Sequence, residues 1–157
     1  KLVKTSFGKY EEIPEEWEVS SFLDVVKLSG GTQPPRNSFS DSPKEGYVRL
    51  LQIRDFESDD LPCYVSKNNN LSFCSKKDIL IARYGASLGK IVKGKEGAHN
   101  VALVRTIPDV MKIDNNFLFY WLNSIKCQSF IFRVGTRSAQ DGFNKLAETD
   151  PLFVPIH

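Results

Sequence analysis

The sequence predicts an α+β fold (mixed α/β), built on a twisted, largely antiparallel sheet with a few short helices. Three observations lead to this prediction. Short β-rich segments are separated by turn residues, as in 78–84 and 98–107. Helical periodicity is confined to the region after residue 115. The chain has 157 residues and 41% hydrophobic content, which fits a single globular domain over 1–157.

In the N-terminal part we expect an extended acidic arm over 1–16, because Pro14 prevents a helix from continuing through it. A first strand begins at Trp17, and a short strand over 23–28 ends at the Gly30-Gly31 break. Residues 30–46 then form a loop without apolar periodicity, and loops of this length are usually functional or disordered.

The remaining strands follow from runs of apolar and β-branched residues. We expect strands over 47–56, 78–84, 90–93 and 98–107, with a turn at 85–89 and an end at Pro108. A helix begins at Asn115, a good N-cap, with one apolar face: Phe117, Leu118, Trp121, Leu122 and Ile125. A second short helix covers 128–134, and 152–156 is a final extended segment.

Composition excludes several classes of protein. No run approaches 18 apolar residues, so a membrane span is not expected, and no charged-then-apolar leader opens the chain. The three cysteines, Cys63, Cys74 and Cys127, lack CxxC spacing and are expected to be reduced intracellular thiols. A zinc site or a histidine-based triad would depend on His99, since the other histidine is the last residue.

The stretch 89–96 matches GxxxxGK, the start of a phosphate-binding P-loop, but has Glu96 where Ser or Thr should hold Mg²⁺. A P-loop also lies between a strand and a helix, whereas 91–92 has the character of a strand. No dinucleotide fingerprint or nucleophile elbow is present. We therefore expect that this chain is not an enzyme.

The net charge of +2 is unevenly distributed. Residues 1–60 carry a net charge of −4, whereas 61–147 carry +8. A basic central and C-terminal stretch suggests one positive face suited to a polyanion. A solvated surface with chance asymmetry is the alternative at this point.

Polar side chains that suit nucleic acids form four clusters, each beside a glycine. They are Thr32, Gln33, Arg36 and Asn37; Arg83, Tyr84, Ser87 and Lys90; His99 and Asn100; and Thr136, Arg137, Ser138, Gln140, Asn144 and Lys145. Arg, Gln and Asn bridge two atoms of a base edge, and Lys, Ser and Thr commonly hold phosphates. We expect base contacts from Gln33, Arg36, Arg83, Asn100 and Gln140, and phosphate contacts from Lys90, Lys93, Arg137 and Lys145. The alternative is ordinary polar loops.

The order of several segments resembles the specificity subunit of type I restriction–modification enzymes, at the level of one target recognition domain. The matching pieces are Gly8 with Ile13-Pro14 and Trp17; Leu23-Asp24-Val25 with Gly30-Gly31-Thr32; Tyr47 to Asp55; Asp78 to Lys90; and Gly135-Thr136 with Leu152-Phe153-Val154-Pro155. Each piece is short, but they occur in the family's order and cover nearly the whole chain.

The resemblance implies a cytoplasmic, non-catalytic module that reads one half of a bipartite double-stranded DNA site. Its implied partners are DNA methyltransferase (modification) subunits and a restriction subunit. Those methyltransferase subunits would bind S-adenosylmethionine, and this chain itself is expected to need no cofactor and no metal. The family's long spacer helix is absent, so the chain is expected to be a fragment or half of a specificity subunit.

Two other interpretations remain open at this stage. One is a recognition domain from a single-chain restriction–methylation enzyme. The other is an unrelated enzyme whose site includes His99, which a buried His99 would exclude.

Overall fold

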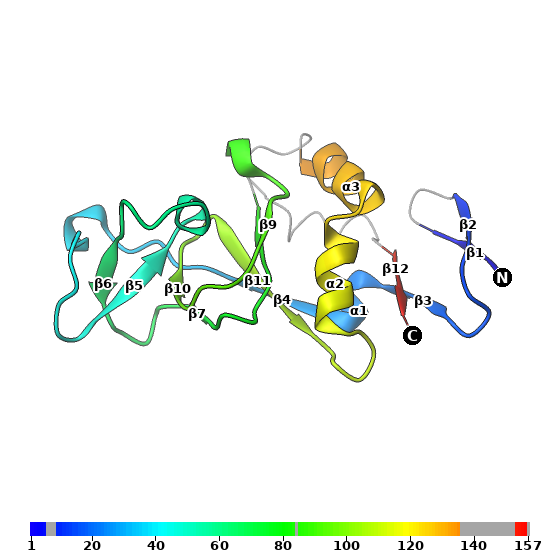
Figure 1. The fold of residues 1–157 in the computed structure, drawn as a ribbon, viewed down its shortest axis with the longest axis horizontal. Helices are drawn as coiled ribbons and strands as arrows, with labels where there is room; N and C mark the ends of the chain where they lie inside the picture. The colour runs from blue at the N-terminus through cyan, green and yellow to red at the C-terminus, as the bar shows by residue number, and fades with distance from the viewer. Residues whose placement is uncertain (6–8, 84, 136–152, 157) are drawn as a thin grey trace. The chain divides into compact units, whose positions relative to one another are not determined.

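The computed structural model describes residues 1–5, 9–83, 85–135 and 153–156 (Figure 1). The chain forms two compact units. Unit 1 comprises Lys1–Leu28 and Ile107–His157, and unit 2 comprises Ser29–Thr106. Strands β4 (Val26–Gly30) and β11 (Leu103–Pro108) carry the chain across the boundary. Within the described residues, no helix is long and apolar enough to cross a membrane.

Unit 1 joins the two ends of the sequence through a strand pair. Strand β3 (Glu18–Ser21) pairs antiparallel with β12 (Phe153–Ile156). Strands β1 (Leu2–Lys4) and β2 (Tyr10–Glu12) form a separate antiparallel hairpin. The helices of the unit are α1 (Phe22–Val25), α2 (Asn115–Leu122) and α3 (Ile125–Gly135).

The helices of unit 1 bury one apolar face each. Leu118 and Leu122 of α2 are four residues apart and fully buried, as expected for one helix face. On α3 the buried residues are Cys127, Phe130 and Ile131. Phe22 of α1 stacks on Trp121 with 5.9 Å between ring centroids, so the single turn α1 is held by aromatic packing.

Unit 2 contains a four-stranded sheet in the order β6-β5-β10-β7. Its strands are β5 (Tyr47–Leu51), β6 (Tyr64–Ser66), β7 (Phe73–Cys74) and β10 (Gly97–His99). Strands β5 and β10 are parallel, whereas β6 and β7 pair antiparallel with their neighbours. A second sheet has the order β4-β11-β8-β9, with β8 (Leu80–Ala82) and β9 (Ile91–Val92). Both pairings of β8 are antiparallel.

Both faces of strand β5 are buried at its C-terminal end. Successive side chains of a strand point to opposite faces, and Leu50 and Leu51 enter two different apolar clusters. Leu51 packs with Cys74, Leu80, Ala82, Val92 and Leu103. Leu50 packs with Cys63, Val65, Leu71 and Ala98. Strand β5 is therefore the centre of the core of unit 2.

The predicted fold class is confirmed, and several predicted boundaries are corrected. The segment 23–28 is divided between α1 and β4. The strand 47–56 ends at Leu51, because the Asp55 carboxylate accepts a hydrogen bond from the Gln52 N–H at 2.6 Å and starts the 3₁₀ turn η3 (Ile53–Phe56). The strand 98–107 is two strands, β10 and β11, interrupted by a turn in which the Asn100 side chain accepts from the Ala102 N–H.

Corrections to the helices are smaller. The N-cap of α2 is Asp114 rather than Asn115, because the Asp114 carboxylate accepts from the N–H groups of Asn116 and Phe117. Helix α3 begins at Ile125, three residues before the predicted start. Strands β6 and β7 were not predicted.

Candidate nucleic-acid interface

The start of the long loop lies directly against the end of β10. A Cβ atom added at Gly31 would lie 1.8 Å from the Asn100 carbonyl oxygen and 2.6 Å from that of His99. Only glycine allows the two backbones to approach this closely. The Thr32 N–H donates to the His99 carbonyl at 3.1 Å. Two of the predicted clusters are thus joined through their backbones.

The Arg83 side chain lies beside the same loop start in unit 2. A Cβ atom added at Gly30 would lie 3.5 Å from Nη1 of Arg83, so the guanidinium is next to the glycine pair. The Arg83 N–H donates to the Ala102 carbonyl at 3.0 Å, in the turn after Asn100. The structure therefore brings together Arg83, Asn100 and the loop start, which come from three separate segments.

Thr32 has partners inside the protein. Its hydroxyl donates to the Asn70 carbonyl at 2.7 Å and lies 3.4 Å from the Ser72 hydroxyl. Its side chain therefore fastens the loop to the segment before β7. Asn70 and Ser72 were not among the predicted site residues, and no spacing in the sequence connects them to Thr32.

Gln33 and Arg36 extend from this anchored start into solvent. Both side chains are exposed, and Arg36 begins the 3₁₀ turn η2 (Arg36–Ser38). Arg83 and Asn100 are half-buried. The described part of the chain thus presents an anchored group at the loop start and two exposed side chains further along the loop.

The predicted hairpin is present between β8 and β9. It turns through the 3₁₀ segment η4 (Gly85–Ser87), and the Lys90 N–H donates to the Ser87 carbonyl at 3.0 Å. Gly89 has φ +85°, which favours glycine at this turn. Ser87 is half-buried, whereas Lys90 and Lys93 are exposed.

Lys90 forms an ion pair with Glu57, 33 residues earlier in the chain. Hydrogen bonding and charge attraction from Lys90 lower the pKa of the Glu57 carboxyl. Nothing in the sequence indicates this contact, because Lys90 lies in the hairpin and Glu57 lies in the turn after η3, far apart in the chain. The predicted phosphate ligand Lys90 therefore already has an anionic partner.

A second ion-pair network lies nearby in unit 2 and was not predicted. The Arg49 guanidinium contacts Asp55 at 2.7 Å and Asp59 at 3.0 Å. Lys95 pairs with the same oxygen of Asp59 at 2.5 Å. Asp55 is 1% exposed, whereas Asp59 is 66% exposed. Arg105 also pairs with Asp78. Together with Lys90, Arg49 and Lys95, this makes four basic residues of unit 2 that have acidic partners. The surface of unit 2 is therefore less positive than the charge distribution along the sequence suggests.

The structure corrects the prediction for His99. Its side chain is fully buried, and Nδ1 donates to the Leu103 carbonyl at 3.1 Å. Burial lowers the pKa of the imidazole, and no partner for Nε2 is found among the described residues. A ring enclosed in this way does not touch DNA or act on a substrate, so we exclude it from the interface and reject the enzyme interpretation based on it.

The remaining predicted residues lie outside the described part of the chain. They are Tyr84, Thr136, Arg137, Ser138, Gln140, Asn144 and Lys145. Within the described ranges, no group of three His, Cys, Asp or Glu side chains could hold a metal ion. All three cysteines are buried, and desolvation raises the pKa of Cys74 to about 11 and of Cys127 to about 12.

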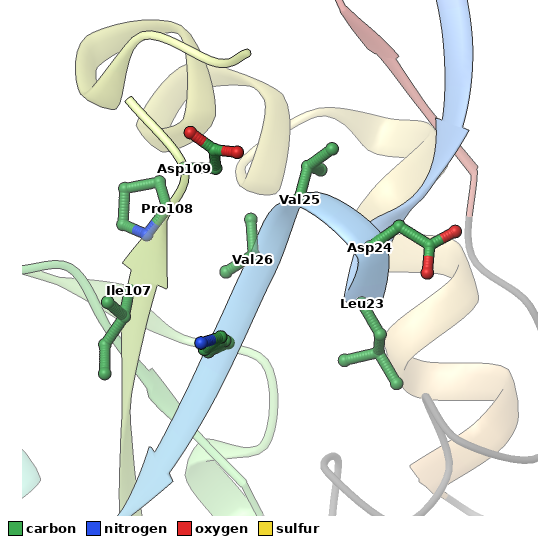
Figure 2. Close-up of a pocket in the computed structure, with 8 residues that line it drawn as sticks. Leu23, Asp24, Val25, Val26, Ile107, Pro108 and Asp109 are labelled. Atoms are coloured by element: carbon green, nitrogen blue, oxygen red, sulfur yellow. The ribbon is translucent and has the colours of Figure 1, made fainter. Parts of the chain in front are cut away.

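Unit 1 contains a surface hollow of about 310 Å³ (Figure 2). It is lined by Leu23, Asp24, Val25, Val26, Lys27, Ile107, Pro108 and Asp109. In the view of Figure 2, Val25 lies between the Asp24 and Asp109 carboxylates. The lining is largely apolar and includes none of the predicted DNA contacts, so the hollow is not assigned to the interface.

Comparison with protein families gives a match over residues 14–149. The matching model is described as the type I restriction modification DNA specificity domain. Among curated proteins, the type I restriction enzyme MjaVIII specificity subunit of Methanocaldococcus jannaschii is 28% identical over 110 residues. That alignment covers 70% of this chain and 25% of the relative.

Solved structures share the fold at low sequence identity. The HsdS subunit from Thermoanaerobacter tengcongensis matches with a TM-score of 0.63 and 16% identity, over 93% of this chain and 34% of that chain. The S subunit of a type I restriction-modification system from M. genitalium matches with a TM-score of 0.61 and 17% identity, over 90% and 34%. The chain thus spans about a third of these structures and a quarter of the curated relative.

Proposed function

Because the chain belongs to the type I restriction modification DNA specificity domain family, we propose that it reads one half of a bipartite duplex DNA site. The observation that supports this proposal best is the junction at Gly31. There the loop start contacts the backbone of Asn100 and lies beside the Arg83 guanidinium. Side chains suited to base edges are thereby fixed on a rigid backbone, which sequence-specific reading requires.

The chemistry of each side chain suggests a role. An arginine reads guanine through O6 and N7, and an asparagine or glutamine reads adenine through N6 and N7. Arg83 and Asn100, held by the junction, and Gln33 and Arg36, exposed on the loop, are the proposed base contacts within the described residues. Lys90 and Lys93 on the hairpin are the proposed phosphate contacts.

Further contacts are proposed outside the described residues. Gln140 would reach a base edge, and Arg137 and Lys145 would hold phosphates. Tyr84, Thr136, Ser138 and Asn144 would complete the contact surface.

The proposed setting is a cytoplasmic restriction–modification complex. DNA methyltransferase subunits would bind S-adenosylmethionine and modify the site, and a restriction subunit would cleave unmodified DNA. This chain would supply recognition and no catalytic group or cofactor. The curated relative is named as a specificity subunit, which supports this division of labour.

Selection from random duplex DNA by the assembled complex tests the proposal. We expect enrichment of a half-site motif whose identity depends on this chain. Exchanging this chain for the equivalent part of another specificity subunit should change that half-site and leave the other half unchanged. Failure to enrich any motif, or a motif that survives the exchange, would refute the proposed function.

A further inference from the structure

We propose that the acidic turn, residues 57–60, is a built-in competitor of DNA phosphate for the basic side chains of unit 2. The proposal rests on the proposed function and goes beyond it. The acidic turn would lower the affinity for every duplex by the same factor. This would reduce residence on DNA that is bound through phosphate contacts alone, while a site that also gains base contacts stays occupied.

The shape of the acidic turn is fixed by its own hydrogen bonds. The N–H groups of Glu57 and Ser58 both donate to the Arg54 carbonyl, at 3.0 and 3.2 Å. The Ser58 hydroxyl accepts from the Asp60 N–H at 3.1 Å. The acidic side chains therefore project from an ordered turn.

The acidic turn meets three basic residues that come from other elements. Glu57 pairs with Lys90 of the hairpin. Asp59 pairs with Lys95 at 2.5 Å and with Arg49 of β5 at 3.0 Å. These contacts span up to 36 residues of sequence, so they reflect the fold of unit 2 rather than helical or hairpin spacing.

The ion pairs differ in how far their side chains are buried, and this decides which of them DNA can displace. The side chains of Glu57 and Lys90 are 67% and 41% exposed, so a DNA phosphate can approach Lys90 and replace the carboxylate. Arg49 is 20% exposed and is also held by the buried Asp55, so it stays in place. Lys90 is therefore the side chain whose partner we expect to change.

Charge keeps the competition active at neutral pH. Lys90 lowers the pKa of Glu57, and Lys95 and Arg49 lower that of Asp59, so both carboxylates are ionised when DNA arrives. A phosphate and a carboxylate are alternative acceptors for one ammonium group. An exposed pair of this kind changes an equilibrium by no more than about fivefold, so the acidic turn weakens DNA binding without preventing it.

The acidic turn offers its own control. Asp60 carries the same charge in the same turn, and no ion pair of Asp60 is recorded within the described residues. Glu57→Gln frees Lys90, whereas Asp60→Asn removes one negative charge and frees no lysine. Comparison of the two variants separates release of a lysine from a general change in charge.

The test measures binding of the assembled complex to two fluorescent duplexes, one with the selected site and one scrambled. We expect Glu57→Gln to tighten both complexes by the same factor, about three- to fivefold at low salt. The slope of log K against log salt should change by much less than the ~0.9 of one phosphate contact, because Lys90 contacts a phosphate in both bound complexes once the carboxylate is displaced. Asp60→Asn should change affinity by less than about twofold, with no change of slope.

A double-mutant cycle with Lys90→Gln makes the result decisive. In the Lys90→Gln background, Glu57→Gln should give no further gain in affinity for either duplex. An equal gain with and without Lys90, or an equal effect of Glu57→Gln and Asp60→Asn, would overturn the proposal. If the wild type fails to prefer the selected duplex, the proposed function fails, and the cycle on the scrambled duplex still reports on the acidic turn.

A measurement without DNA checks the ion pair itself. In an NMR titration of the Glu57 carboxyl, Lys90→Gln should raise its pKa toward the ordinary value of a glutamate. A Glu57 pKa that does not respond to Lys90→Gln would show that the two side chains do not pair in solution, and would also overturn the proposal.

Discussion

Replacement of Gly31 by alanine tests the junction on which the proposed interface depends. The new Cβ would lie 1.8 Å from the Asn100 carbonyl oxygen and 2.4 Å from its carbonyl carbon. Ordinary van der Waals contact begins at 3.4 Å. Both neighbouring atoms belong to the backbone and cannot rotate away, so the two segments must separate by about 1.6 Å.

The expected loss of stability follows from two effects. Forcing one extra carbon into a packed contact costs about 1–3 kcal/mol. Separation of the segments also breaks the hydrogen bond from the Thr32 N–H to the His99 carbonyl, worth about 0.5–1.5 kcal/mol. We therefore expect Gly31→Ala to lower the free energy of unfolding by about 1.5–4.5 kcal/mol.

Urea unfolding of Gly31→Ala beside Gly30→Ala provides the assay. The Cβ of Gly30→Ala would meet Nη1 of Arg83 at 3.5 Å, an ordinary contact with a movable side chain. This control should stay within about 1 kcal/mol of the wild type. If the two variants were equally stable, the close approach at Gly31 would be wrong, and so would the argument that the junction fixes Arg83 and Asn100.

Three further predictions concern buried groups. Because burial lowers the pKa of His99, the unfolded chain takes up its proton at a higher pH than the folded chain. The free energy of unfolding should thus fall by at most about 1.4 kcal/mol per pH unit between about pH 6.5 and the lower pKa of the folded protein, and His99→Gln should remove this contribution in urea titrations. Asp55→Ala leaves Arg49 without its buried partner and should cost about 2–4 kcal/mol, whereas Asp59→Ala removes an exposed partner and should cost much less; equal costs would contradict the assigned burial. Cys127, with its pKa raised to about 12, should resist alkylation in the folded protein and react at the rate of unfolding, which timed mass spectrometry would measure.

Local sequence signals predicted the elements that depend on local chemistry. The β8–β9 hairpin follows from an apolar run, 79–82, and from the turn glycines Gly85 and Gly89, both at positive φ. The start of α2 follows from a capping residue before an apolar periodic segment, although the cap is Asp114. These features need no knowledge of distant contacts.

Features that depend on tertiary contacts could not be predicted. Strands β6 and β7 have three and two residues, and they are strands because they pair with β5 and β10. The early end of β5 depends on the Asp55 side chain folding back on the Gln52 N–H. Residue type alone suggested a DNA contact at His99, but its neighbours in the fold bury the side chain.

Among the candidate site residues, the glycine signal was the most informative. In the sequence, Gly30-Gly31 indicated the end of a strand. The structure shows a close backbone approach there, which brings Arg83 and Asn100 together. The pairing of Lys90 with Glu57 crosses 33 residues and has no sequence signal. Positive charge counted along the chain therefore overestimates the positive charge that is available to a partner.

The central claim, that Arg83 reads a base from the junction, is tested most directly by a specificity profile. Binding of wild type and Arg83→Ala is measured on the selected site and on every single-base variant of its half-site. We expect discrimination at one position to fall by about 1–3 kcal/mol, with the other positions unchanged. A uniform loss of affinity, with the profile intact at every position, would contradict the claim.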